Sequence, residues 1–327
     1  MRPVVLTPGD PEGIGPEVVG KALSGGPGGW DRPVVVIGDA RALERWIPSM
    51  VRVTDLTPVP GAVAVLDPGD DGEPVEVASI RRAVRACLDG QARAIVTGPI
   101  HKAKLARRGF AHPGHTEFLA ALCGVDRVVM AFVGGQVRVS LVTVHVPVRE
   151  IAARLTTDLV LHTIRASHHA LRRWAPPRAL IGPLGRPAGT IAVCGLNPHA
   201  GDEGLLGAED QDVVAPAVRA AVGEGIAAIG PLSAEAAFRA AVRGEVDWVV
   251  AMYHDQGLAP LKALEWAAAR TATTAVGEGR AVNWTLGLPI LRVGVDHGTA
   301  YDIAGKGIAD PGSLVAALRL ADELAPG

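Results

Sequence analysis

The amino-acid sequence predicts an α/β fold in which helices cover both faces of a largely parallel sheet. Apolar runs rich in β-branched residues recur along the chain, and segments rich in Ala, Leu and Arg with helical spacing separate many of them. A chain of 327 residues that is 48% hydrophobic and 20% charged also has enough apolar material for one large domain or two. We therefore expect a folded globular protein.

The predicted strands recur from the N-terminus to the C-terminal quarter. In order they are PVVLTPGD from Pro3, PVVVIGD from Pro33, AIVTGPIHK from Ala94, VRVSLVTVHVPV from Val137, TIAVCGLNPHAG from Thr190, DWVVAMYHDQG from Asp247 and PILRVGVDHGTA from Pro289. A helix is predicted to begin at residues 156–158, Thr-Thr-Asp, which are typical of a helix N-terminus. The residues that follow recur on one face with helical periodicity. They are Leu161, Ile164, His168 and Leu171.

The turn GDPEGIGPEV lies between the first predicted strand and a helix. Gly13 and Gly15 begin the pattern GxGxxG, but Val18 occupies its last glycine position, so the turn fails as a standard dinucleotide fingerprint. Pro16 suits the first turn of a helix. We expect a structural turn that opens a helix.

Charge and apolar patterning exclude several classes of protein. A formal net charge of -2 gives no general attraction to nucleic acid or anionic lipid. The N-terminal apolar run is too short for a signal peptide, and no window supplies the roughly 20 apolar residues that span a bilayer. Cys87, Cys123 and Cys194 form no CxxC pair and are expected to be core thiols. The sequence predicts a cytoplasmic protein with a small-molecule substrate and no nucleic-acid or membrane partner.

Histidines follow the apolar runs unusually often. Ligands of open α/β sheets bind at the carboxyl ends of strands, which is where five of the ten histidines are predicted to lie. They are His101, His145, His199, His254 and His297. Three imidazoles from separate strands would form a site for zinc or another divalent ion. Alternatively, these histidines cap strand ends with hydrogen bonds.

Lysine is rare in this chain, which has five lysines against 27 arginines. A lysine in a polar, glycine-punctuated stretch is then a candidate for a role that needs a compact, tunable ammonium group. Lys102, Lys262 and Lys306 meet this description, although each is also compatible with a surface position.

Seven motifs taken together resemble the 4-hydroxythreonine-4-phosphate dehydrogenase family, the enzymes of vitamin B6 synthesis, and its close relatives. They span nearly the whole chain and read TPGDPEGIGPEV, TGPIHKAKL, GHTEFLA, TVHVPVREI, CGLNPHAGDEG, AMYHDQGLAPLK and VNWTLGLPILRVGVDHGTAYDIAGKG. The resemblance implies two α/β domains with the active site in the cleft between them. The first domain is expected to comprise residues 1–110 plus 305–327, and the second residues 111–304.

The same resemblance implies a site with three kinds of residue. The metal ligands would be His145, His199 and His254, one of them contributed across a homodimer, with Zn, Mg, Mn or Co as the ion. The contacts to a small phosphorylated hydroxy acid would be His115, Thr116, Lys262, Asn283 and Arg292. The general base is left open between Asp255 and Lys102, and Asp255 could instead orient a histidine.

The segment DHGTAYDIAGKGIADP further resembles the nucleotide-binding loop of isopropylmalate and isocitrate dehydrogenases. Gly298, Thr299 and Asp302 would bind NAD, with Asp302 accepting a hydrogen bond from the adenosine ribose. Asp302 could equally cap the loop. The expected reaction oxidises the secondary hydroxyl of 4-phosphohydroxy-L-threonine to a β-keto acid, which decarboxylates to 3-amino-2-oxopropyl phosphate.

One connection departs in length from the family pattern, and this departure bears on which substrate the protein binds. The connection between Lys262 and Asn283 is about a dozen residues longer than usual, and it is either a neutral insertion or a segment that reshapes the pocket. Alternative substrates are threonate or erythronate 4-phosphate and an aromatic dihydrodiol. An alternative of another class is a metal-dependent binding protein without catalysis.

Overall fold

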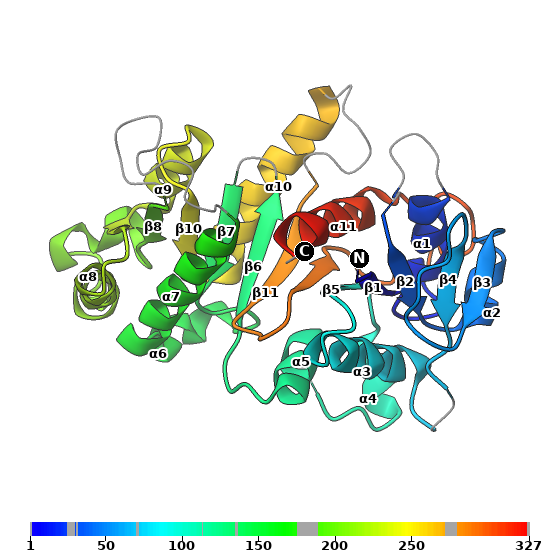
Figure 1. Ribbon diagram of the computed structural model, residues 1–327. Coiled ribbons are helices and arrows are strands. Elements are labelled where there is room, and N and C mark those ends of the chain that lie inside the picture. The colour runs from blue at the N-terminus through cyan, green and yellow to red at the C-terminus, as the bar shows by residue number, and fades with distance from the viewer. Residues whose placement is uncertain are drawn as a thin grey trace. The chain divides into compact units, whose positions relative to one another are not determined.

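The computed structural model describes residues 2–24, 30, 32–69, 72–112, 114–134, 137–174, 189–271 and 280–325. The chain divides into two compact units. The first is discontinuous and comprises Met1–Val128 and Thr273–Gly327, whereas the second is the continuous segment Val129–Ala272. Each unit consists of a mixed, largely parallel sheet with helices packed on it (Figure 1), which confirms the predicted α/β class.

The first unit is built on seven of the described strands. They run in the order β3-β4-β2-β1-β5-β12-β11, and all neighbours are parallel except β11 and β12. The strands are β1 (Val4–Thr7), β2 (Val34–Ile37), β3 (Met50–Val53), β4 (Val63–Leu66), β5 (Ala94–Thr97), β11 (Val282–Leu286) and β12 (Arg292–Val295). The helices are α1 (Gly15–Leu23), α2 (Ala40–Glu44), α3 (Val75–Leu88), α4 (Lys102–Arg107), α5 (His115–Cys123) and α11 (Gly312–Leu324).

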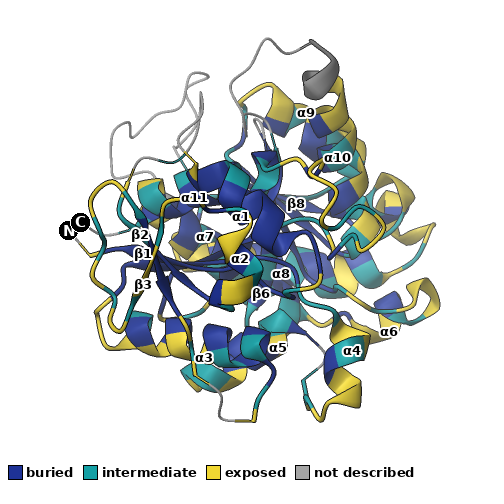
Figure 2. Ribbon diagram, turned by 90° about the vertical axis from the view of Figure 1, so that its right-hand side faces the viewer, coloured by how far each residue is buried: buried dark blue, intermediate teal, exposed yellow. Residues whose placement is uncertain are grey.

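Helices cover the two faces of this sheet because alternate strand residues point to opposite sides. Val5 belongs to a buried cluster that also contains Val77 and Ile80 of α3 and Leu119 of α5. Its neighbour Leu6 is also buried and points to the other face, on which α1 and α11 lie (Figure 1). The strands are therefore buried from both sides, as the dark-blue centre of Figure 2 shows. Near-continuous apolar runs are what such strands require.

The second unit has five described strands in the order β6-β7-β10-β8-β9, of which only β6 and β7 are antiparallel. The strands are β6 (Val129–Gly134), β7 (Val137–Leu141), β8 (Ile191–Cys194), β9 (Ala228–Leu232) and β10 (Trp248–Ala251). The α-helices are α6 (Ile151–Arg154), α7 (Thr157–Trp174), α8 (Ala215–Gly223), α9 (Ala234–Val242) and α10 (His254–Thr271). Shorter helical segments are η1 (Val148–Glu150), η2 (Pro198–Gly204) and η3 (Asp210–Val214).

Two helices of the second unit pack on opposite faces of its sheet. Ser140 of β7 lies 2.7 Å from Ser167 of α7, between the two hydroxyl oxygens. Its neighbours on β7, Val139 and Leu141, face Gly257 of α10, where a Cβ atom would lie 2.6 Å from the Leu141 side chain. Because residues 139 and 140 point to opposite sides, α7 covers one face and α10 the other.

The domain boundaries differ from the predicted ones. Residues 111–128 and 273–304 were expected in the second domain, but both ranges belong to the first unit. The reason is packing and strand pairing: α5 packs against α3, and β12 pairs with β5 in parallel. The motif that ends in DHGTA thus completes the sheet that begins at the N-terminus.

The local predictions largely agree with the structure. All seven predicted runs contain a strand, and α1 begins at Gly15 with Pro16 in its first turn. The Thr156 hydroxyl accepts a hydrogen bond from the Leu159 N–H at the start of α7. The three cysteines are free, and burial raises the pKa of Cys194 to about 12, as expected of a core thiol. None of the helices in the described part of the chain is both long and apolar enough to cross a membrane.

Candidate functional site

Three neighbouring strands of the first unit bring chemically active side chains to one edge of its sheet. The strands β1, β5 and β12 are adjacent and parallel, so their carboxyl ends meet. Asp10 follows β1, Lys102 follows β5, and His297 follows β12. This edge is the predicted location for ligand binding in an open α/β sheet.

A cavity of about 210 Å³ lies at this edge. Its walls are formed by the ends of β5 and β12, the following loops and the first residue of α5. The lining residues are Thr97, Gly98, Pro99, Ile100, Lys102, His115, Arg292, Val295, His297 and Gly298. Two of the predicted substrate contacts, His115 and Arg292, therefore meet in one cavity.

Arg292 is held rigidly in the wall of this cavity. One terminal guanidinium nitrogen donates to the side-chain oxygens of Asn283 at 2.5 Å and Thr285 at 2.9 Å, and the other donates to the Thr97 hydroxyl at 2.7 Å. The guanidinium lies over Gly294, where a Cβ atom would be 2.5 Å from its nearer nitrogen. The glycine two residues after Arg292 therefore makes room for the arginine side chain.

The charge of Arg292 has no acidic counterpart in the described part of the chain. All three of its hydrogen-bond acceptors are neutral oxygens, although the residue is only 4% exposed. Burial lowers the pKa of Arg292 to about 10, which still leaves it charged at neutral pH. A buried cation without a counter-ion is costly, so this site favours an anionic ligand.

Three buried nitrogen atoms around the cavity have no hydrogen-bond partner among the described residues. They are Nε of Arg292, Nε2 of His115 and Nε2 of His297. Burial, with the charges of Arg292 and Lys102, lowers the pKa of His115 well below its ordinary 6.5. His115 is therefore neutral at pH 7 and can offer a hydrogen bond without adding charge. Unpartnered polar nitrogens beside a buried cation are typical of a site that binds a polar ligand.

The remaining predicted substrate contacts, Asn283, Thr116 and Lys262, do not line this cavity. Asn283 is buried and its side-chain oxygen accepts from Arg292, so it positions the arginine. Thr116 follows His115 in the first turn of α5 but does not line the cavity. Lys262 belongs to the second unit, where it forms a 2.7 Å hydrogen-bonded ion pair with Glu265. Lys102, expected as a possible base, lines the cavity together with Arg292.

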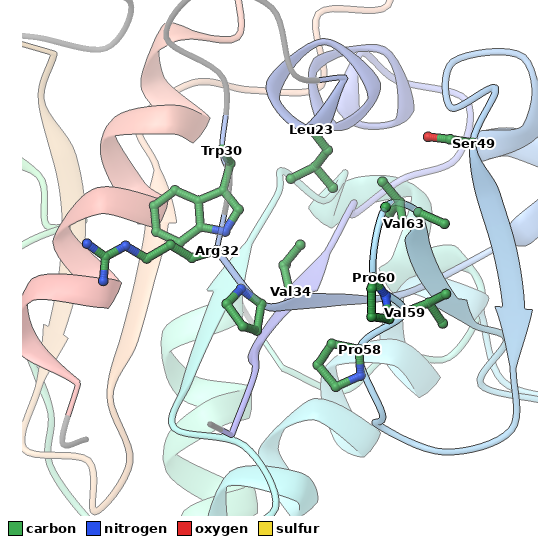
Figure 3. A pocket seen from close by; sticks show the side chains of 12 residues that line it. Leu23, Trp30, Arg32, Val34, Ser49, Pro58, Val59, Pro60 and Val63 are labelled. Carbon is green, nitrogen blue, oxygen red and sulfur yellow. The ribbon is translucent and has the colours of Figure 1, made fainter.

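A larger cavity of about 340 Å³ lies at the opposite, amino ends of β2 and β4 (Figure 3). Proline and aliphatic side chains dominate its walls. Its one guanidinium, that of Arg32, is paired with Asp322 at 3.0 Å. Chemistry rather than volume therefore favours the smaller cavity as the functional site.

The predicted nucleotide-binding loop is fastened to the turn that follows β1. The Ile14 N–H donates to the Thr299 carbonyl at 2.9 Å, and the Tyr301 hydroxyl donates to the Asp10 carboxylate at 2.5 Å. Lys104 also donates to Asp10, at 3.0 Å. Burial would raise the pKa of Asp10, but the bonds from Tyr301, the Glu12 N–H and Lys104 outweigh it and lower this pKa below 3.8.

The three predicted cofactor residues lie in or next to this connection. Gly298 lines the cavity that holds Arg292 and His115, here called the anion cavity. Thr299 is buried against the turn, and Asp302 is exposed. Burial, followed by the hydrogen bond to Asp10, raises the pKa of Tyr301 to about 12, so its hydroxyl remains a donor at neutral pH. The contacts of Thr299 and Tyr301 therefore hold the loop, whereas the exposed Asp302 carboxylate makes no hydrogen bond with the described residues.

The second unit holds the predicted metal ligands. The imidazole rings of His145 and His254 lie 5.9 Å apart, centroid to centroid. The Asp255 carboxylate lies 2.8 Å from Nδ1 of His254, which agrees with the expectation that Asp255 orients a histidine. A carboxylate that accepts a hydrogen bond from one ring nitrogen fixes the ring orientation and tautomer, so that the other nitrogen can bind a metal ion. This arrangement is usual for metal-binding histidines.

His199, the third predicted ligand, follows β8 in the segment η2 and is exposed. Within the described ranges, no three His, Cys, Asp or Glu side chains form a group that could hold a metal ion. The donor chemistry of His145 and His254 fits a divalent ion, although these two residues alone are an incomplete set of ligands. A complete site requires a further donor.

Two other sequence expectations can be placed. His101 makes a capping hydrogen bond, but at the start of α4 rather than at a strand end, because its Nδ1 accepts from the Lys104 N–H at 3.0 Å. The long connection after Lys262 begins as the last part of α10, and its residues 272–279 lie outside the described part of the chain.

Sequence reasoning missed three residues of the site. His297 had a signal, since it follows a strand directly, but no role was given to it. Thr97 ends β5 within the motif TGPIHK and holds the guanidinium. Tyr301 had no signal, because its contact with Asp10 joins positions 291 residues apart.

Comparisons with known proteins agree along the whole chain. The sequence profile of the family described as pyridoxal phosphate biosynthetic protein PdxA matches residues 31–321. A 4-hydroxythreonine-4-phosphate dehydrogenase from Geobacter metallireducens is 41% identical over 98% of this chain and 95% of its own. A protein from Bradyrhizobium diazoefficiens, provisionally named D-threonate 4-phosphate dehydrogenase, is 39% identical over 100% of this chain and 97% of its own. A 4-hydroxythreonine-4-phosphate dehydrogenase structure from Klebsiella pneumoniae has a TM-score of 0.84 and 34% identity, covering 100% of this chain and 98% of that one.

Proposed function

The chain belongs to the family of the pyridoxal phosphate biosynthetic protein PdxA, and from this premise we propose that it is a metal-dependent, NAD-linked 4-hydroxythreonine-4-phosphate dehydrogenase. The proposed reaction oxidises the secondary hydroxyl of 4-phosphohydroxy-L-threonine. Its product is a β-keto acid that loses carbon dioxide to give 3-amino-2-oxopropyl phosphate.

The observation that carries this proposal is the buried, uncompensated guanidinium of Arg292. A phosphate dianion would supply the missing negative charge and accept hydrogen bonds from the unpartnered nitrogens of Arg292 and His115. Lys102 would add a second cation from the same wall. We therefore assign Lys102 to phosphate binding rather than to proton abstraction.

In the second unit, His145 and His254 would hold a divalent ion together with His199. The ion, when bound, would supply a Lewis acid that lowers the pKa of the substrate hydroxyl. Asp255 would keep the His254 ring in the orientation and tautomer that ligation needs. Lys262, with its Glu265 partner, would make a further contact with the substrate.

Gly298, Thr299 and Asp302 would hold NAD, which supplies the hydride acceptor when bound. The contacts of Thr299 and Tyr301 support this part of the proposal, because they keep the loop in one conformation without a ligand. A preordered loop pays less entropy when a nucleotide binds.

A second candidate substrate is D-threonate 4-phosphate. The relative from Bradyrhizobium diazoefficiens that bears this name is nearly as similar to the chain as the 4-hydroxythreonine-4-phosphate dehydrogenases. Both substrates carry a phosphate, so the Arg292 cavity suits either. An aromatic dihydrodiol has no phosphate and would leave Arg292 uncompensated, which makes it the weaker alternative.

The deciding experiment follows nicotinamide absorbance while purified protein is incubated with NAD and each candidate substrate. We expect turnover with a phosphorylated hydroxy acid, loss of turnover after chelation of divalent ions, and recovery when an ion is restored. The His199→Ala variant should contain less metal than the wild type. Full activity in metal-free protein would contradict the metal assignment, and binding of metal without turnover of any candidate would favour the non-catalytic alternative.

A further inference from the structure

The segment that carries His199 has an unusual backbone. Residues 199–203 all have positive φ angles, between 42° and 82°, and only Gly201 among them is a glycine. For the other four residues this left-handed conformation brings Cβ close to the following carbonyl group, and consecutive residues rarely adopt it. Such a run persists only where the surrounding structure imposes it.

The carboxylate of Asp210 packs against this turn and binds the backbone just before it. It accepts hydrogen bonds from the Leu196 N–H at 2.6 Å and the Asn197 N–H at 3.0 Å. Asp210 is fully buried, and a Cβ atom on Gly201 would lie 3.3 Å from its second oxygen. The end of β8 and the left-handed turn are therefore packed around one carboxylate.

Gln256 joins the same strand end to the start of α10. Its side-chain nitrogen donates to the Gly195 carbonyl at 2.7 Å, and its side-chain oxygen accepts from the Met252 N–H at 2.6 Å. Gly195 precedes the His199 turn, and Met252 precedes His254. Gln256 is the polar residue of the motif MYHDQG that the proposed function leaves without a role.

We propose that Asp210 and Gln256 are positioning residues that form one clamp. Asp210 holds the His199 turn in its left-handed conformation, and Gln256 fixes that turn relative to the segment that carries His254. The inference rests on the proposed function, because the purpose it assigns to the clamp is to aim two metal-binding histidines. Neither residue contacts the substrate or the ion.

The test uses the full-length protein, prepared metal-free and titrated with Co²⁺, whose absorption spectrum reports the ligand geometry. The variants are Asp210→Asn, which keeps the shape but removes the charge, and Gln256→Met, which removes both hydrogen bonds. The matched control is Asp247→Asn. The Asp247 carboxylate accepts from the N–H groups of Gly189 and Thr190, at 2.8 and 3.1 Å, and so fastens the opposite end of β8.

We expect both clamp variants to bind Co²⁺ about 10- to 100-fold more weakly than the wild type, with an altered absorption spectrum. The Asp247→Asn variant should lose thermal stability to a similar extent but bind Co²⁺ with wild-type affinity. The proposal is overturned if the clamp variants bind Co²⁺ as the wild type does, or if the control variant is weakened equally. If Asp210→Asn does not fold, Gln256→Met decides the outcome alone.

Hydrogen exchange separates failure of the clamp from failure of the proposed function. The Leu206 N–H donates to the Gly201 carbonyl across the turn, at 3.0 Å. Its exchange in metal-free protein should be faster in Asp210→Asn than in Asp247→Asn. A wild type that binds no Co²⁺ refutes the metal assignment, whereas unchanged exchange at Leu206 refutes the clamp whether or not an ion binds.

Discussion

Two side chains of the anion cavity have properties that depend on burial rather than on residue type. Arg292 is charged but has no acidic partner among the described residues, and His115 is neutral because Arg292 and Lys102 add to the effect of its burial. Motif position predicted both residues as substrate contacts. It could not predict that His297 and Thr97 complete the same cavity, because their roles follow from the adjacency of β5 and β12.

Arg292→Met should remove phosphate binding without destabilising the fold. Loss of the guanidinium should cost about 3 kcal/mol of transition-state binding, or about two powers of ten in kcat/KM for a phosphorylated substrate. Removing a charge that was buried without a counter-ion should offset the hydrogen bonds lost by Asn283, Thr285 and Thr97, so the free energy of unfolding should stay about level. Inorganic phosphate should raise the Tm of the wild type but not that of the variant.

Arg93→Met is the contrasting variant. Arg93 is also buried, but it forms an ion pair with Asp322. Removing it leaves the Asp322 carboxylate with only the exposed Arg32 as an ionic partner, so this variant should lose about 1 to 3 kcal/mol of stability in urea unfolding. Equal destabilisation by the two substitutions would contradict the proposal that Arg292 binds an anionic ligand.

His115 should make stability depend on pH between its lowered pKa and 6.5, the ordinary value. In that window the unfolded chain binds a proton that the folded chain does not, so stability falls as the pH decreases. His115→Gln removes this contribution. Urea unfolding at pH 5.5 and 7.5 should show a smaller loss of stability in the variant than in the wild type, and identical losses would mean that His115 titrates normally.

At the scale of elements, α1 is joined to the C-terminal segment by one buried carboxylate. Glu17 is 1% exposed and accepts from Lys21 at 2.9 Å, the Ala309 N–H at 2.7 Å and the Gly307 N–H at 3.2 Å. Burial would raise its pKa, but these three donors outweigh it and lower the pKa below 4.5. The first helix and the loop before the last one are thus linked by charge-assisted hydrogen bonds.

Glu17→Gln should lower the free energy of unfolding at pH 7 by about 1 to 3 kcal/mol. Because the folded-state pKa is lowered, the contribution of the carboxylate is present above 4.5 and is lost as the pH falls through the folded value. The difference between wild type and variant should therefore narrow in acid. Glu44→Gln is the control in urea titrations, since its ion pair with Arg52 is exposed and should contribute under about 1 kcal/mol.

The local sequence pattern predicted secondary-structure elements well where a single signal, such as an apolar run, dominated a segment. Every predicted apolar run contained a strand, because buried parallel strands need such runs. Five of the described strands lay outside the predicted runs, namely β3, β4, β6, β9 and β11. Two of them lack a clear signal, since Val51 and Arg52 of β3 are exposed and β9 contains Pro231. The left-handed turn at 199–203 was not predictable, because four of its five residues are not glycine and adopt a conformation that local preference opposes.

For the whole molecule, the division of the chain depends on pairing between distant segments. The contact between β12 and β5 joins residues about 200 positions apart, and no composition shift marks where the second unit begins or ends. The sequence therefore predicted a discontinuous first domain through family resemblance, but not its boundaries. Oligomeric state is likewise beyond local pattern.

We predict a homodimer that completes the metal site. His145 and His199 are exposed, and the same segments expose large apolar side chains, with Val148 at 78% and Leu205 at 82%. Such a surface is expected to be covered in an assembly. Since His145 and His254 lie together in one chain, we expect His199 to come from the partner.

Mixing inactive variants tests this arrangement. His199→Ala mixed with His254→Ala should regain activity through hybrid dimers, because one of the two sites is then intact. His145→Ala mixed with His254→Ala should stay inactive if His199 is the shared ligand, and should recover if His254 is. A fully active monomer in light scattering coupled to an assay would rule out the dimer.

The discontinuous first unit also has a consequence for synthesis on the ribosome. The second unit is complete once residue 272 has left the exit tunnel, but β5 then still lacks β12, and Glu17 lacks the amides of Gly307 and Ala309. The N-terminal segment must therefore remain as a nascent chain with an open sheet edge while a later segment folds. Chains released before β12 would keep that edge exposed, so premature termination should yield aggregation or chaperone capture even though the second unit is whole.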